Sequence, residues 1–368
     1  MIKSIITNDI LKHITAIEEN RLRVADIEMP AIEMNRLRKN SKRKSSYASN
    51  KIEGNPLTEI QSDEAIDSDP HKHFLKPEQE VRNYFSALSY LERELTKKTK
   101  VSTKMIMDVQ AIVEKGASAE KIGFRGPMPP GMLFAVYDSQ SSEAEYIPPE
   151  AADIPVLMYE LENYIQTTDD YPLIMAAIVH YQLVTIHPFE DGNGRTARLI
   201  SGYIMDLYGY GFRGIGSLEE YFAYDPDEYY ESLQMGLPAL YYSGRNDPPH
   251  PETWIDYFLR MVELYSSKVY EISKGTKEND VSVTLSGFGG RSRELLKYIL
   301  EEKKTEYRPI DIAKELGVTN WTIINRTAEL VLVKEGFVIP VLVRERVTAY
   351  RISDYTKAYK NEIMKLLN

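Results

Sequence analysis

Apolar residues recur at every third or fourth position along most of this chain, which is the spacing of an amphipathic helix. Pro77 supports a helix start near residue 78, because proline is favoured in the first turn. The spacing predicts helices over residues 10–25, 78–95, 153–166, 171–186 and 193 to about 208. The chain of 368 residues is therefore expected to be mainly α.

Residues 123–149 interrupt the helical pattern. Proline and glycine are frequent between Gly123 and Gly131, and short apolar runs follow on both sides of the polar residues 138–143. Such runs, bounded by turn residues, are typical of a β-hairpin. A hairpin with a purely structural role remains an alternative to one with a role in binding.

A separate unit is expected at the C-terminal end. A polar and then glycine-rich segment, residues 271–290, precedes a helix at 292–301, a helix, turn and helix at 310–330, and an alternating pattern at 337–352. This order is typical of a winged helix-turn-helix. Residues 289–368 carry 15 Lys and Arg against 11 Asp and Glu, within a chain of net charge −10.

The positive C-terminal unit predicts a docking module, and two kinds of partner stay open. DNA would be bound through residues 289–352, with the polar residues of the second helix as readers: Asn320, Thr322, Asn325 and Arg326. Trp321, Ile323 and Ile324 on the same helix instead favour burial, and small winged-helix units often contact proteins.

Composition excludes several classes of protein. There is no cysteine, so neither disulfides nor thiolate metal sites are available. The N-terminus lacks a signal-peptide pattern, and no apolar run approaches the length of a membrane span. A globular, cytoplasmic protein with no membrane partner is expected. Six basic residues between Asn35 and Lys44 are interpreted as a solvated face or loop.

The residues from His187 to Arg198, His-Pro-Phe-Glu-Asp-Gly-Asn-Gly-Arg-Thr-Ala-Arg, combine several elements of nucleotide chemistry. The Gly192–Gly194 run before an apolar helix can form an anion nest at a positive helix end. Asp191 suits Mg²⁺, which needs few protein carboxylates. Arg195 and Arg198 can bind phosphate oxygens, and His187 can accept a proton at neutral pH. His180, by contrast, is interpreted as a packed structural histidine.

This stretch resembles the signature HxFx(D/E)GNGRxxR of the Fic family and matches every specified position. The resemblance implies a helical bundle that transfers a nucleoside monophosphate, usually AMP from ATP, to a Ser, Thr or Tyr hydroxyl of a protein. It implies His187 as catalytic base and Asp191 as the Mg²⁺ ligand. The ATP-binding residues that it implies are Gly192, Asn193, Gly194, Arg195, Thr196, Ala197 and Arg198.

A second resemblance lies upstream, where Ser49-Asn-Lys-Ile-Glu53-Gly54 matches the inhibitory motif (S/T)xxxE(G/N) of Fic proteins. In that family the glutamate pairs with the second signature arginine, here Arg198, and keeps the γ-phosphate from its seat. The residues alone also fit a plain helix end, since glycine favours that position. An inhibitory helix is therefore expected at about residues 45–54.

Two further segments resemble parts of the family fold. The hairpin at 123–149 corresponds to a flap that pairs with the target segment and aligns its hydroxyl with His187. Residues 219–230 resemble the segment NRxxYY that closes over adenine and ribose, which implies nucleotide contacts from Asp225 and Tyr229. Asp225 stands where the family often has asparagine, and a carboxylate cannot donate hydrogen bonds as an amide can.

The expected organisation is an N-terminal helical region at residues 1–100, a Fic catalytic domain with flanking helices at 101–275 and a winged helix-turn-helix at 285–368. Self-modification and a homodimer are compatible with it, and some of the 26 tyrosines could be acceptors. Alternatives stay open for the reaction: removal of AMP from a modified target, phosphoryl or phosphocholine transfer, or a DNA-binding regulator that uses the site as a nucleotide sensor.

Overall fold

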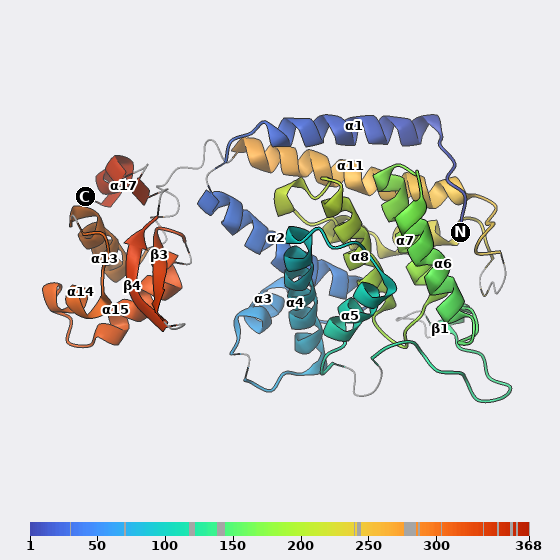
Figure 1. Cartoon of the computed structure of the whole chain (residues 1–368), viewed down its shortest axis with the longest axis horizontal. Helices are drawn as coiled ribbons and strands as arrows, with labels where there is room; N and C mark the ends of the chain where they lie inside the picture. Colours follow the sequence, from blue (N-terminus) through green and yellow to red (C-terminus); the bar gives the residue numbers. More distant parts are fainter. Residues whose placement is uncertain are drawn as a thin grey trace. The chain divides into compact units, whose positions relative to one another are not determined.

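The computed structural model describes residues 1–29, 31–69, 71–117, 122–137, 144–238, 240, 244–275, 285, 288–302, 304–333, 335–343, 346–353, 356–357 and 360–367. Its helices in the first three quarters of the chain are α1 (Asn8–Ala25), α2 (Ala31–Ile52), α3 (Glu59–Asp67), α4 (Lys76–Thr96), α5 (Thr103–Val113), α6 (Ile154–Thr167), α7 (Pro172–Ile186), α8 (Asn193–Leu207), η1 (Phe212–Gly214), α9 (Glu219–Phe222), α10 (Pro226–Gln234) and α11 (Pro251–Gly275). Strands β1 (Val136–Tyr137) and β2 (Ala144–Tyr146) pair antiparallel between α5 and α6. The mainly α architecture predicted from the sequence is confirmed (Figure 1).

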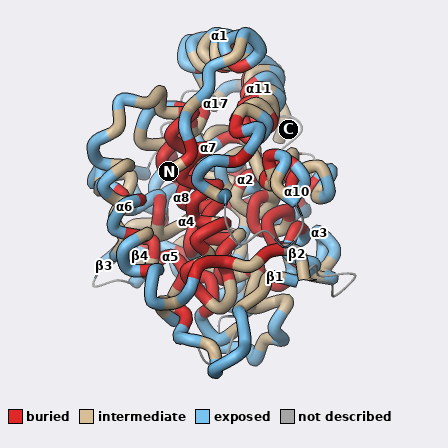
Figure 2. The backbone as a smooth tube through the Cα atoms, turned by 90° about the vertical axis from the view of Figure 1, so that its right-hand side faces the viewer, coloured by how far each residue is buried: buried red, intermediate tan, exposed pale blue. Residues whose placement is uncertain are grey.

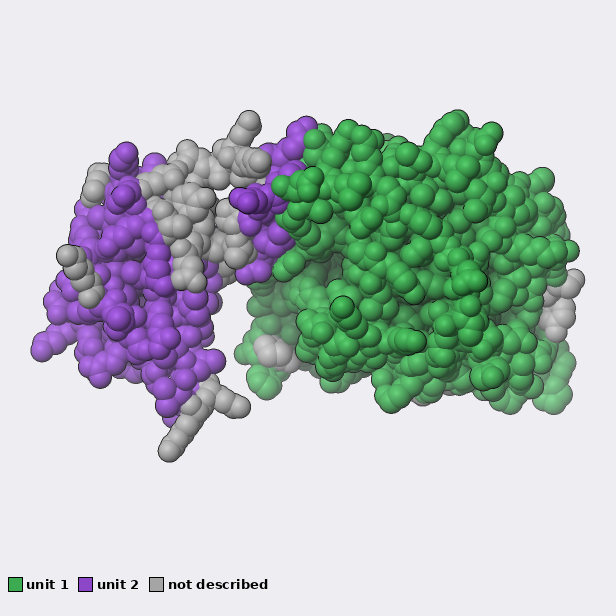
Figure 3. All heavy atoms as spheres, turned by 45° about the horizontal axis from the view of Figure 1, so that its top comes forward, with its two compact units in different colours: residues 1–26, 37–271 green, residues 27–36, 272–368 purple. Residues whose placement is uncertain are grey.

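The chain divides into two compact units, coloured separately in Figure 3. Unit 1 comprises residues 1–26 and 37–271, and unit 2 comprises residues 27–36 and 272–368. Helices α2 and α11 each cross a boundary between the units. All residues of the predicted catalytic signature lie in unit 1.

Helix α7 is the centre of unit 1. Its sequence is apolar on every side, and a helix of that kind is stable only when neighbours surround it. Both α7 and α8 are largely buried in Figure 2. Neither α7 nor any other helix in the described part of the chain is both long and apolar enough to cross a membrane. The buried helices α7 and α8 pack against each other and are joined by the loop of residues 187–192.

Helix α1 lies along α11 at one side of unit 1 (Figure 1). Asn20 of α1 donates to Ser266 and Ser267 of α11, each over 3.0 Å. Further along α11, the fully buried Trp254 donates from its indole nitrogen to the carbonyl of Ala177 in α7, over 2.7 Å. Helix α11 thus joins the outer helix α1 to the central helix α7.

The basic residues between Asn35 and Lys44 form part of α2 rather than a solvated loop. Lys42 pairs with Glu92 at 2.9 Å, and Lys44 pairs with Glu220 at 2.8 Å. Arg43 binds Asp67 of α3. These ion pairs join α2 to three neighbouring helices. The segment is therefore a helix face and not a loop, and part of this face, including Arg36 and Arg38, is exposed.

Unit 2 contains the element order expected for the C-terminal end. Helices α13 (Gly290–Glu301), α14 (Pro309–Glu315) and α15 (Trp321–Thr327) are followed by the π-helical turn η2 (Ala328–Val333), strands β3 (Val338–Val343) and β4 (Arg346–Ile352), and helix α17 (Lys360–Leu367). The two strands pair antiparallel, with Val338 opposite Ile352. The helices and the hairpin share one apolar core.

Helix α15 is less buried than its sequence indicated. Ile324 is fully buried, but Trp321 is 47% exposed and Ile323 is 37% exposed. A seven-residue helix packs with one face, and only Ile324 of these three lies on the face toward the core. The expectation that much of α15 is covered is therefore wrong for this unit taken by itself.

Candidate functional site

The candidate site is built around the loop that joins α7 to α8. His187 ends α7 in the left-handed conformation, with φ 48°, and Pro188 prevents the helix from continuing. Gly192 has φ 81°, a conformation that glycine adopts without strain. Asn193 closes the loop, because its side chain accepts from Phe189 N at 3.0 Å and donates to Phe189 O at 2.9 Å. The first turn of α8 then begins beside the histidine.

His187 is arranged to act as a base. Its Nδ1 lies 3.2 Å from the carbonyl oxygen of Val184. A carbonyl can only accept, so the neutral ring donates from Nδ1 and keeps the lone pair on Nε2. Burial lowers the pKa of His187 to about 4, because a charged imidazolium loses its hydration there. The ring is therefore neutral at pH 7.

Arg125 positions the histidine, a role that the sequence did not reveal. Its Nε donates to the His187 carbonyl over 2.8 Å, and its guanidinium lies 4.7 Å from the centre of the Phe134 ring. Phe134 in turn lies 5.9 Å from the imidazole, centre to centre. Strand β2 is tied to the same place, since the Tyr146 hydroxyl donates to Thr185 O. The hairpin segment is thus anchored at the end of α7.

Glu53 and Arg198, 145 positions apart, form an ion pair of 2.5 Å between Oε1 and Nη2. Arg198 also donates from Nε to the Ser49 hydroxyl at 2.8 Å and from Nη2 to the Ser49 carbonyl at 3.0 Å. Burial alone would lower the pKa of Arg198, but the Glu53 carboxylate raises it above its ordinary value. The end of α2 is thereby joined to the middle of α8.

Glu53 also lies against the predicted anion nest. A Cβ atom added to Gly194 would come within 2.3 Å of Glu53 Oε1, so a side chain at this position would require the Glu53 carboxylate to shift. Gly54, with φ 78°, turns the chain away directly after Glu53. Both sequence interpretations of this position are compatible with this geometry: α2 ends at Ile52, and the carboxylate of the next residue, Glu53, lies at the first turn of α8.

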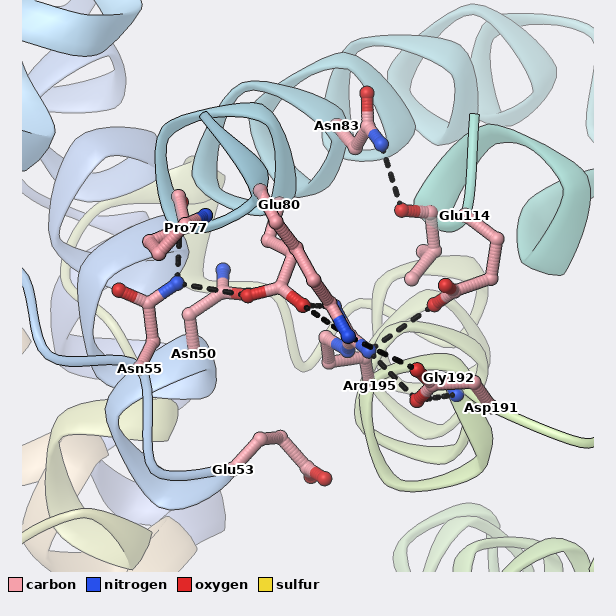
Figure 4. A network of polar contacts seen from close by, with 12 residues as sticks. Asn50, Glu53, Asn55, Pro77, Glu80, Asn83, Glu114, Asp191, Gly192 and Arg195 are labelled. Carbon is pink, nitrogen blue, oxygen red and sulfur yellow. Dashed lines mark hydrogen bonds and ion pairs between the residues drawn. The ribbon is translucent and has the colours of Figure 1, made fainter. Parts of the chain in front are cut away.

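Arg195 faces in a different direction from Arg198. Its Nη2 lies 3.0 Å from Glu114 Oε1 and 3.0 Å from Asp191 Oδ1, and its Nη1 lies 3.6 Å from Glu80 Oε1 (Figure 4). Burial raises the pKa of Glu114 to about 7 against the opposing effect of Arg195. Sequence reasoning missed both glutamates, because they belong to α4 and to the end of α5, where no motif marks them.

A cavity of about 430 Å³ opens between the end of α2, the hairpin, the signature and α10. Its lining residues are Ile52, Glu53, Val136, Tyr137, Tyr146, Val184, Thr185, His187, Gly194, Arg198, Asp227, Tyr229, Tyr230, Glu231, Leu233 and Gln234. His187, Gly194 and Arg198 thus share the cavity with Glu53. Of the remaining predicted nucleotide contacts, Gly192, Asn193, Arg195, Thr196 and Ala197 are not among its lining residues.

Helix α10 contributes to the cavity differently from the sequence expectation. Asp225 caps α10 by accepting from Glu228 N at 3.1 Å and does not line the cavity. Tyr229 does line it, and its hydroxyl lies 2.8 Å from His180 Nε2 and 3.4 Å from Arg198 Nη1. Burial lowers the pKa of His180 well below its usual value, so this neutral histidine supports Tyr229.

Asp191 is the residue that suits a magnesium ion. Its side chain is 42% exposed, and Oδ2 has Lys76 Nζ at 3.8 Å, whereas Oδ1 accepts from Gly192 N at 2.7 Å. Among the described residues no group of three or more potential ligands is placed to hold a metal ion by itself. One exposed carboxylate oxygen still fits Mg²⁺, which completes its shell with water and substrate phosphates.

Comparison with known proteins identifies the central segment. Residues 86–205 match the Fic/DOC family. The chain contains a Fic domain. Among curated relatives, a protein adenylyltransferase Fic from Nematostella vectensis is 30% identical over 200 residues, which cover 53% of this chain and 44% of that protein. Another, from Drosophila mojavensis, is 26% identical over 211 residues, 54% of this chain and 38% of that protein. The chain spans less than half the length of these two relatives.

Solved structures show the same fold around this Fic domain. A Fic family protein from Desulfovibrio desulfuricans G20 has a TM-score of 0.59 at 20% identity and covers 96% of this chain and 98% of its own. Fic-1 from C. elegans has a TM-score of 0.55 at 22% identity over 73% of each chain. The Fic-type bundle predicted from the signature is confirmed as a fold.

The acid titration of His187 provides a test of the site geometry. Because burial disfavours the imidazolium, we expect the His187 ring of the folded protein to take up a proton only near pH 4. In the unfolded chain the same histidine is protonated below about pH 6.5, so the folded state should lose stability as the pH falls below that value. The ring proton resonances, assigned by their loss in His187→Ala, give the midpoint by NMR. A midpoint at or above 6.5 would contradict the arrangement described.

Proposed function

We propose that this protein transfers AMP from ATP to a Ser, Thr or Tyr hydroxyl of a protein target, and to itself as a side reaction. The observation that carries the proposal is the shared cavity of His187, Gly194 and Arg198 in a Fic domain. The curated relatives named protein adenylyltransferase support the same class of enzyme.

The chemistry follows from the two ends of the signature. His187 Nε2, which carries the lone pair, takes the proton of the acceptor hydroxyl. The hydroxyl oxygen then attacks the α-phosphorus, the bond to the bridging oxygen breaks, and pyrophosphate leaves. Backbone N–H groups at the start of α8 and the Arg198 guanidinium stabilise the negative charge of the polyphosphate. Mg²⁺ held by Asp191 would neutralise further phosphate charge.

The Glu53–Arg198 pair supports autoinhibition of this reaction. Arg198 is buried, with 1% of its side chain exposed, and its Nη2 is bound by Glu53. A γ-phosphate needs the same guanidinium, and the Glu53 carboxylate would also repel it at Gly194. ATP would then bind with its α-phosphate displaced from the line of attack. The wild-type chain is accordingly a weak transferase.

Labelled ATP distinguishes the proposed reaction from the alternatives. In a Glu53→Gly background, label from the α-phosphate should appear on protein, and His187→Ala should reduce this transfer by at least about 10²-fold because the general base is lost. Bound ATP, measured by equilibrium dialysis, should remain in the His187→Ala variant. Label from the γ-phosphate alone would indicate phosphorylation, and no label on any protein would favour a nucleotide sensor.

Removal of the inhibitory carboxylate should activate the enzyme. Glu53→Gly frees Arg198, and since a misplacement of about 1 Å can cost roughly 10²-fold in rate, self-modification with α-labelled ATP should rise by about that factor. Arg198→Ala in the same background should reverse the gain. Glu59→Gly, at an exposed glutamate in the first turn of α3, is the matched control and should leave activity at the wild-type level. Equal rates for Glu53→Gly and Glu59→Gly would disprove autoinhibition by this pair.

Unit 2 suggests a second function, docking on DNA, because α15 presents an exposed face. Trp321, Thr322 and Arg326 are exposed there, and Asn320 caps the helix by accepting from Thr322 N at 3.0 Å. Asn325 is instead engaged inside the unit, since its Oδ1 accepts from the Tyr350 hydroxyl at 2.8 Å. The exposed candidate readers are thus Asn320, Thr322 and Arg326, although the Thr322 hydroxyl donates to Asn320 Oδ1 over 2.6 Å.

Binding of duplex DNA by the full chain should weaken steeply with salt, because bound counterions are released. Arg326→Ala should weaken binding and lower the slope against salt by about one charge if the arginine meets a phosphate. Lys365→Ala, which removes an exposed charge from α17, is the comparison. No mobility shift with mixed duplexes at low salt would leave a protein as the partner of this unit.

A further inference from the structure

Of the two arginines of the signature, Arg198 lines the cavity and Arg195 does not. The Arg195 side chain, 3% exposed, is enclosed behind the loop by carboxylates from three segments (Figure 4). Asp191 belongs to the loop, Glu80 to α4 and Glu114 to the end of α5. Arg195 therefore acts on its surroundings through these carboxylates.

Glu114 occupies an unfavourable position for a carboxylate. Its side chain is 1% exposed, and it caps the C-terminal end of α5, where the helix dipole disfavours negative charge. Both of its oxygens are buried without a hydrogen-bond partner in the described part of the chain, although Oε1 lies 3.0 Å from Arg195 Nη2. A buried ion pair of this kind contributes little net stability. Its presence points to a role in placing Arg195.

Glu80 supports the guanidinium from the other side. Its Oε1 lies 3.6 Å from Arg195 Nη1 and 3.7 Å from Lys76 Nζ, and its Oε2 accepts from Asn55 Nδ2 at 2.9 Å. Three carboxylates thus share one guanidinium. Because Glu80 and Glu114 attract the Arg195 guanidinium away from Asp191, it does not turn to form a bidentate pair with Asp191.

The position of the Arg195 guanidinium determines which carboxylate oxygen of Asp191 remains exposed to solvent. Arg195 Nη2 and Gly192 N both bind Oδ1, at 3.0 and 2.7 Å. Oδ2 is left with Lys76 Nζ at 3.8 Å, and that lysine is 57% exposed. A guanidinium released from Glu114 and Glu80 would be able to take both oxygens of Asp191, because arginine and carboxylate favour bidentate pairing.

We propose that Glu114 and Glu80 are positioning residues that hold Arg195 on one oxygen of Asp191 and so keep the other oxygen available for Mg²⁺. The inference rests on the proposed function, which makes Asp191 the metal ligand. Residues that orient a metal-binding carboxylate typically change metal affinity by about 10- to 100-fold when they are replaced.

The test measures metal-dependent nucleotide binding without turnover. Full-length protein carrying Glu53→Gly is titrated calorimetrically with α,β-methylene-ATP, once with Mg²⁺ and once with EDTA, and the ratio of the two dissociation constants is compared between variants. Glu114→Gln and Glu80→Gln should each reduce the advantage given by Mg²⁺ by about 10-fold. Affinity in EDTA should stay at the level of the parent variant.

The controls separate positioning from general damage. Asp108→Asn removes a carboxylate from the same helix α5 but one that pairs with Lys104 at 2.6 Å, so its ratio should equal that of the parent. Thermal unfolding should not be lowered in Glu114→Gln, because two carboxylates still compensate Arg195. A ratio unchanged in both glutamine variants, or an equal loss of affinity with and without Mg²⁺, would overturn the proposal.

Failure of this inference can be told apart from failure of the proposed function. Asp191→Asn in the same background should abolish most of the Mg²⁺ advantage. If it does so and the parent transfers α-label while Glu114→Gln and Glu80→Gln keep the parent ratio, only the positioning role is rejected. If Asp191→Asn itself keeps the parent ratio, Asp191 is not the metal ligand and the positioning role is rejected with it.

Discussion

The site depends on one constraint: the Arg198 guanidinium is buried and must have a counter-charge. Leaving a buried charge without a partner is far more costly than exchanging one partner for another. In the structure the counter-charge is the Glu53 carboxylate at 2.5 Å. Under the proposed function, a nucleotide phosphate would compete with the Glu53 carboxylate for this guanidinium.

The packing of the rest of unit 1 restricts the movement that such a competition at Arg198 would require. Helix α7 is buried on nearly every side, and α8 packs against it, so the loop of residues 187–192 has little freedom to move. Helix α2 is held along its length by ion pairs to other helices, such as Lys42 to Glu92 and Lys44 to Glu220. Replacement of Glu53 as the partner of Arg198 would therefore require the Glu53 side chain to move rather than the helices. Glu53 lies just beyond the end of α2, directly before Gly54.

The sequence was most informative where function concentrates several residue types in a short segment. The signature predicted the loop, the start of α8 and the base, and the upstream motif predicted that Glu53 meets Arg198. These inferences depended on the family pattern, because local periodicity alone gave only a helix end at Glu53. Arg125, Glu80 and Glu114 could not be found in this way, since each acts through one long-range contact and has no spacing that marks it. The exposure of Trp321 was missed for the opposite reason: an apolar residue in a short helix was assumed to be covered.

Arg195 and Arg198 illustrate how far spacing can be used. Residues three apart lie on one side of a helix, and the sequence therefore assigned both arginines to phosphate. The helix does place them together, but their partners differ. Ser49 of α2 and Glu53, directly after α2, bind Arg198, whereas Glu114, Glu80 and Asp191 surround Arg195. Carboxylates from α4, the end of α5 and the loop therefore surround Arg195, whereas Arg198 lines the cavity. Under the proposed function, the two arginines of one motif would then have separate tasks, binding of phosphate by Arg198 and orientation of the loop by Arg195.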